Sequence, residues 1–70
     1  MNSIIKNILS ELDCYIYRFN EATNTIEHKH STASSIHITT ELISIIHKLN
    51  ANDIKYEVDG NENIQILYNP

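Results

Sequence analysis

The histidines at positions 28 and 30 are the residues whose type and spacing point most directly to chemistry. They lie in the stretch "TIEHKH", residues 25–30. Side chains two positions apart on a β-strand point to the same face, so both imidazoles could ligate one zinc ion. A structural zinc site needs about four protein ligands, and a catalytic one about three with an added water.

The further ligands that such a site would need are dispersed along the chain, at Cys14, His37, Glu41 and His47. Neither Cys-x-x-Cys nor His-Glu-x-x-His, the spacings that fix zinc geometry, is present. We therefore interpret His28 and His30 as polar residues at the end of a half-exposed strand, packed beside tyrosines. A metal site built on them stays open as an alternative, and we expect no cofactor.

Cys14 with His30 could be considered as a nucleophile and its general base. Nothing in the sequence orients that histidine, and the single glycine, Gly60, excludes a glycine-rich loop that cradles phosphate. We interpret Cys14 as a small apolar strand residue. The expected protein is not an enzyme.

The length of 70 residues predicts one small domain, residues 1–70. A chain this short buries only about 60% of its unfolded surface, and small domains often need a disulfide, a metal or a partner. One cysteine makes no internal disulfide and is typical of a reducing compartment. Without a secretory signal or an apolar run of about 20 residues, the chain is expected to be cytoplasmic, with no membrane partner.

The charge pattern excludes some partners. Five basic and nine acidic residues give a net charge of −4, and the basic residues form no stripe of the kind that binds a phosphate backbone. Direct nucleic-acid binding is therefore not expected. Four acidic side chains fall within residues 53–62, namely Asp53, Glu57, Asp59 and Glu62. This segment could meet a basic partner, or it could be a hairpin whose charge maintains solubility.

The first half of the chain reads as a helix followed by a hairpin. Apolar spacing predicts a helix over 3–12 with Ser3 as its N-cap, and β-branched and aromatic residues predict strands at 14–19 and 25–30. In the preferred register Phe19 pairs with Ile26, so that Tyr17 meets His28 and Tyr15 meets His30. The alternative register pairs Ile16 with His28 and Cys14 with His30, and it exchanges the two faces.

The second half repeats this order. Residues 36–39, "IHIT", could form a short strand that leads into the next helix, and the sequence leaves this open. A helix over 40–50 is expected to be capped by Thr39 or Thr40. Residues 54–58 alternate, with Ile54, Tyr56 and Val58 facing inward, and Val58 pairs with Ile64 across the turn. The sequence therefore predicts an α+β fold in the order helix–hairpin–helix–hairpin. Its antiparallel sheet has four or five strands, with two helices on one face.

Aromatic side chains on the strands provide candidate anchors for a partner, because tyrosine tolerates partial exposure and is enriched at interface hot spots. We single out Tyr15 and Tyr17. Together with Glu57, Asp59 and Glu62 they form the predicted partner-binding set. Burial of such a surface would also stabilise a chain that has no disulfide.

These observations favour a small acidic protein-binding module that acts stoichiometrically. One concrete form is an inhibitor or adaptor encoded by a phage or mobile element, a source suggested by the abundance of Ile, Asn and Lys. Its target would be a host protein that handles nucleic acid and has a basic surface. The alternative is a homodimer, formed through a strand edge or the open sheet face, with a structural or small-ligand or metal-binding role.

Overall fold

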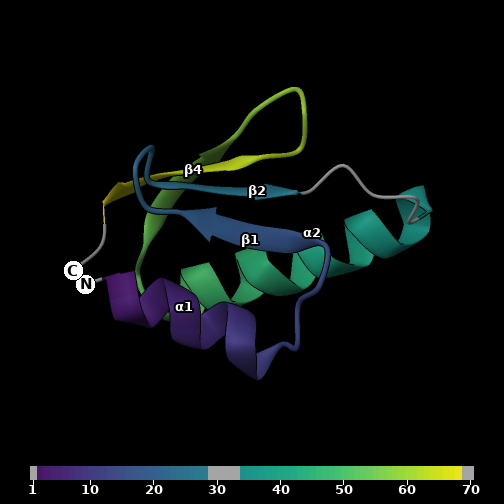
Figure 1. Ribbon diagram of the computed structural model, residues 1–70. Coiled ribbons are helices and arrows are strands. Elements are labelled where there is room, and N and C mark those ends of the chain that lie inside the picture. The colour runs from purple at the N-terminus through teal and green to yellow at the C-terminus, as the bar shows by residue number, and fades with distance from the viewer. Residues whose placement is uncertain (1, 29–33, 69–70) are drawn as a thin grey trace.

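The computed structural model describes residues 2–28 and 34–68. Its elements are α1 (Asn2–Glu11), β1 (Tyr17–Asn20), β2 (Thr25–His28), α2 (Ser35–Ala51), β3 (Lys55–Val58) and β4 (Ile64–Tyr68). The four strands form one antiparallel sheet in the order β1-β2-β4-β3, so the α+β class is confirmed. Figure 1 shows both helices on the same side of this sheet.

The core lies between the helices and the sheet and consists almost entirely of isoleucine. Helix α1 contributes Ile5 and Ile8, and α2 contributes Ile45 and Leu49. The remaining buried side chains are Ile16, Tyr17, Ile26, Ile54, Ile64 and Ile66.

Across the described residues, no helix has the length and apolar character needed to cross a bilayer.

Helix α1 begins at Asn2, so Ser3 lies in its first turn and the prediction of Ser3 as the N-cap is wrong. Two residues after each helix lies an aspartate in the left-handed backbone conformation, at φ 54° for Asp13 and 57° for Asp53. The amide that follows each aspartate donates to a carbonyl one turn back, Leu9 O and Leu49 O, at 3.0 Å in both cases. This arrangement satisfies orphan carbonyls at the helix end and turns the chain back toward the sheet.

Helix α2 is longer than the sequence pattern indicated. The question of a strand at 36–39 is settled in favour of a helix, because these residues lie in the N-terminal turns of α2. The N-cap is Ser34, whose hydroxyl accepts from the His37 amide at 3.4 Å, so Thr39 and Thr40 lie inside the helix. Ile38 extends the apolar stripe of α2 by one turn and is half-buried against the core. Tertiary packing and the serine cap therefore outweigh the β-branched run.

In the first hairpin the preferred register is confirmed: Phe19 pairs with Ile26 and Tyr17 with His28. The expected pairing of Tyr15 with His30 involves a residue outside the described ranges. Strand β1 is shorter than the predicted 14–19 and begins at Tyr17. The segment before β1 is irregular because its backbone amides donate outside the sheet. For example, Ile16 N donates to Glu41 Oε1 at 3.2 Å.

In the second hairpin Val58 pairs with Ile64, as predicted. Ile54 is buried and Tyr56 is half-buried, as expected for inward-facing residues. Val58 is 42% exposed, so the prediction that it is buried with them is wrong. A register shift between Lys55 and Tyr56 interrupts the alternation of β3. Such a bulge bends an edge strand and increases its twist.

The two hairpins join through β2 and β4, which we call the central seam. Within the described residues it is defined by two residue pairs, Thr25 with Gln65 and Ile26 with Ile64. The seam is lengthened by Asn24, whose carbonyl accepts from Ile66 N at 3.0 Å and whose side chain donates to Ile66 O at 3.1 Å. The seam thus places Ile26 and Ile64 together at the centre of the sheet, where both are fully buried.

We predict that Ile26→Val lowers the free energy of unfolding by about 1 kcal/mol, since it removes one buried methylene from a close-packed site. The matched control is Ile43→Val, at a side chain that is 61% exposed, and it should change stability by less than about 0.5 kcal/mol. Urea unfolding followed by circular dichroism measures both. Equal destabilisation by the two variants would contradict the placement of the core.

Candidate functional site

The loop between β3 and β4, residues 59–63, is held in one conformation by its own polar groups, and we call it the acidic loop. The Asp59 carboxylate accepts from Asn61 N at 2.8 Å and from Asn63 N at 3.0 Å. Its backbone amide donates to Asn63 O at 2.9 Å, and Glu62 N donates to Asp59 O at 3.2 Å. An aspartate that bonds amides further along the chain is a standard device for fixing a turn.

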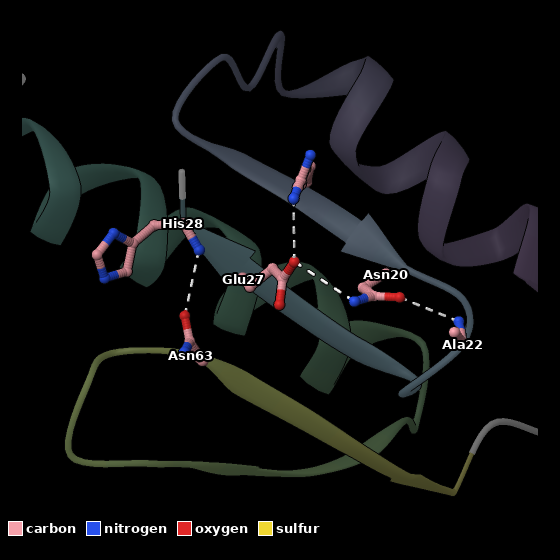
Figure 2. Close-up of polar contacts among 6 residues, drawn as sticks. Asn20, Ala22, Glu27, His28 and Asn63 are labelled. Carbon is pink, nitrogen blue, oxygen red and sulfur yellow. Dashed lines mark hydrogen bonds and ion pairs between the residues drawn. The ribbon is translucent and has the colours of Figure 1, made fainter. Parts of the chain in front are cut away.

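The first hairpin holds the acidic loop from outside. The Tyr17 hydroxyl donates to Glu62 O at 2.7 Å. The His28 amide donates to Asn63 Oδ1 at 3.2 Å, as Figure 2 shows. His28 Nε2 lies 2.7 Å from Asn61 O, and because a carbonyl only accepts, this ring nitrogen carries the proton. Three consecutive residues of the loop are therefore bonded to β1 or β2.

Tyr17 and His28 support one another, as their rings meet edge to face at 5.8 Å between centroids. Burial raises the pKa of Tyr17 to about 12, and the carboxylates of Glu62, Glu41 and Asp59 add to the shift. The phenol is therefore neutral at physiological pH and keeps its proton for the bond to the loop. The sequence pattern predicts other roles for them, Tyr17 as a surface anchor and His28 as a polar residue at the end of a strand.

The predicted partner-binding residues fall into two groups. Glu57, Asp59 and Glu62 are all exposed, on β3 and the acidic loop, and Tyr15 is 66% exposed. Tyr17 is only 3% exposed, so the prediction of Tyr17 as a surface anchor is corrected: its ring lies in the core. Its hydroxyl acts indirectly by positioning the loop that carries Glu62.

Tyr15 lies at the same end of the sheet as the acidic loop. The antiparallel pairs place the start of β1 beside the end of β2 and hence beside the start of β4. Tyr15 comes two residues before β1, and the acidic loop directly precedes β4. An exposed aromatic ring and the three exposed carboxylates therefore share one end of the molecule.

The two histidines predicted as weak metal candidates have different outcomes. The Nε2 atom of His28 is occupied by the bond to Asn61 O, and His30 lies outside the described residues. Within the ranges 2–28 and 34–68, no three His, Cys, Asp or Glu side chains are grouped to hold a metal ion. The interpretation of His28 as a strand residue packed beside a tyrosine is confirmed for Tyr17.

Cys14 lies close to a carboxylate that the sequence offered only as a possible metal ligand, Glu41. Burial raises the pKa of Cys14 to about 12, helped by the charge of Glu41 and a hydrogen bond to it. The thiol is therefore protonated at neutral pH, when it is a poor nucleophile. The same Glu41 side chain also accepts from Ile16 N, so it orders the segment that leads into β1.

The face of the sheet opposite the helices is polar. Glu27 accepts from Asn20 Nδ2 at 3.5 Å (Figure 2) and forms an ion pair with Arg18 at 3.4 Å. Further along, Thr25 and Gln65 are bonded at 3.1 Å, and Glu57 pairs with Gln65 across the strands. These cross-strand polar pairs suit a face that lies in water.

An open hollow of about 510 Å³ lies beside the acidic loop and is lined by His28, Gly60, Asn61, Glu62 and Asn63. No protein-family model, curated protein or solved structure matches the chain. The site is therefore defined by its geometry: a fixed, exposed, acidic loop on the end of a four-stranded sheet.

We predict that Tyr17→Phe destabilises the protein by about 1 kcal/mol at neutral pH, because the bond to the Glu62 carbonyl is lost while the ring stays buried. Urea unfolding measures this change. In this variant the free energy of unfolding should also fall less steeply between pH 10 and 12 than in wild type. The contribution of Tyr17 to wild-type stability is complete below pH 10 and falls toward pH 12, since the unfolded tyrosine loses its proton near 10 and the folded one near 12.

Cys14 adds a similar alkaline loss, from about pH 9 to 12, but it does so in both proteins. The difference between wild type and Tyr17→Phe therefore isolates the tyrosine. A difference in unfolding free energy that stays constant from pH 8 to 12 would contradict the buried, neutral phenol.

Proposed function

We propose that the protein is a small acidic module that binds another protein stoichiometrically through the acidic loop and the adjoining residue Glu57. The supporting observation is the set of bonds that fixes the loop before any partner arrives. A preorganised loop loses little conformational entropy on binding, so more of the contact energy appears as affinity. The proposed partner has a basic surface of complementary shape.

The proposed mechanism combines charge with one aromatic contact. Glu57, Asp59 and Glu62 give the exposed end of the second hairpin a negative field, which steers a basic partner and raises the association rate. Tyr15, exposed at the same end, is the proposed anchor that slows dissociation. The helix–hairpin–helix–hairpin order serves this mechanism by leaving one end and one face of the sheet free of helices.

The proposed target is a host protein that handles nucleic acid, because such proteins present the basic surfaces that an acidic module would cover. The protein would act in the cytoplasm as an inhibitor or adaptor of a phage or mobile element. Its small size, its net charge of −4 and its abundance of Ile, Asn and Lys support this assignment. A nucleic acid itself would be repelled by the acidic loop.

We predict that neutralising the loop weakens partner binding several-fold. The test variant Glu57→Gln/Glu62→Gln keeps Asp59, whose carboxylate fixes the loop, and changes the net charge from −4 to −2. The matched control Glu11→Gln/Glu21→Gln reaches the same −2 at distant, exposed sites. Both pairs of side chains tolerate the change, since exposed ion pairs contribute little to stability.

Affinity capture from host lysate, read by mass spectrometry at low and moderate salt, makes the comparison. The expected result is one protein recovered in stoichiometric yield by wild type and control, reduced in the test variant, and weakened by salt. Recovery of the bait alone, or equal recovery with both variants, would contradict the proposal.

A further inference from the structure

Gly60, in the acidic loop, is the only glycine of the 70-residue chain, and the fold does not require a glycine there. Its backbone is not in the left-handed region that favours glycine. A Cβ atom at this position would meet nothing within 4 Å. The conformation and packing of the loop would thus accept alanine, and what the glycine changes is access to its own backbone nitrogen.

That nitrogen can react with the side chain of the preceding residue, Asp59, through a five-membered succinimide ring. The Gly60 nitrogen attacks Cγ of the protonated carboxyl group, the N–Cγ bond forms, and the carboxyl hydroxyl leaves as water with the amide proton. Water then opens the ring. Attack at Cγ restores aspartate, whereas attack at the Asp59 backbone carbonyl breaks its bond to nitrogen and leaves isoaspartate. The net reaction is an isomerisation that consumes nothing.

The three aspartates of the chain differ in the amide that follows them. The amides after Asp13 and Asp53 donate to carbonyls of α1 and α2, at 3.0 Å in both cases, and they belong to residues with side chains. The amide of Gly60 has no acceptor among the described residues, and no Cβ hinders it. Asp59 is therefore the aspartate at which ring closure meets least hindrance.

Water, which carries off the proton and opens the ring, has direct access to this position. Asp59 and Gly60 are both exposed, and Figure 1 shows the loop between β3 and β4 projecting away from the helices. We infer that the Asp59–Gly60 step is a modification site, at which aspartate isomerises spontaneously to isoaspartate and the folded loop holds this reaction back.

The bonds that fix the acidic loop oppose ring closure. Asp59 Oδ1 faces the amides of Asn61 and Asn63, at 2.8 and 3.0 Å, whereas the ring requires the carboxyl group turned onto the amide of Gly60. Asp59 N donates to Asn63 O at 2.9 Å, which holds the backbone that must rotate. The reaction therefore proceeds from a transiently opened loop. Hydrogen bonds to a charged group should make the folded chain react at least about tenfold more slowly than the unfolded chain.

Isomerisation releases the acidic loop permanently. In isoaspartate the backbone contains an additional methylene and the free carboxylate is attached directly to Cα, so it no longer reaches the two amides in the observed geometry. The net charge of −4 does not change. The modification thus removes the preorganisation of the loop and leaves its charge. It proceeds whether or not the loop binds a partner.

Incubation of the full-length protein at neutral pH and physiological temperature, followed by peptide mapping with electron-transfer fragmentation, measures isoaspartate at each aspartate. In the folded chain it should form at Asp59 and at neither Asp13 nor Asp53. In the chain unfolded in urea the rate at Asp59 should be at least about tenfold higher. Gly60→Ala, which the loop accommodates, should slow the reaction several-fold in urea, because its Cβ hinders the nitrogen.

A pair of tyrosine variants tests whether the first hairpin holds the reaction back. Tyr17→Phe removes the bond to Glu62 O and should raise the rate in the folded protein by about fivefold. The matched control Tyr56→Phe removes a hydroxyl that is bonded to Asn50 Oδ1 at 3.1 Å, outside the loop, and should react at the wild-type rate.

Unmodified Asp59 in the urea-unfolded chain would overturn the assignment of the site, and so would a Gly60→Ala rate equal to that of wild type. Equal rates at Asp59 in the folded and unfolded chains would overturn the protection by the loop. Equal rates for Tyr17→Phe and Tyr56→Phe would do the same.

Discussion

The pairing of β2 with β4 is the contact on which the rest of the structure depends. Each hairpin is local and would be marginally stable by itself, and in the described part of the chain two strand-paired positions and a few side-chain bonds join them. Those pairs bring Ile26 and Ile64 together, fully buried, beneath the stripes of both helices. Without this seam neither helix would have a surface broad enough to cover, and a core assembled almost entirely from isoleucine would not form.

The same seam connects the core to the proposed binding site. Because β2 ends beside the start of β4, Tyr17 and His28 of the first hairpin reach the loop of the second. The loop backbone is therefore fixed by residues distant in sequence, while the side chains of Glu57 and Glu62 stay in water. The first hairpin thus holds the loop backbone through Tyr17 and His28, while Asp59 both fixes the turn and adds to the exposed charge.

The local features of this fold could be predicted from the sequence because they depend on short-range periodicity. Alternation of apolar residues set the register of Phe19 with Ile26 and of Val58 with Ile64, and both pairings are observed. The first turn of α2 could not be predicted in this way, because its β-branched residues resemble a strand and the cap, Ser34, sits in a polar connection. The role of Tyr17 was also hidden, since its hydrogen-bond partner lies 45 residues away. A closer reading of Asp59 with its asparagine neighbours could have found the fixed loop, because aspartate commonly bonds amides within a turn.

The most direct test of the account is the backbone order of the acidic loop in solution, measured by ¹⁵N relaxation of the amides of residues 59–63. The bonds from Asp59, Tyr17 and His28 predict order parameters of about 0.85, equal to those of the sheet. Values below about 0.6 across these residues would show a flexible loop. Such values would contradict the claim that the first hairpin preorganises the binding surface of the second.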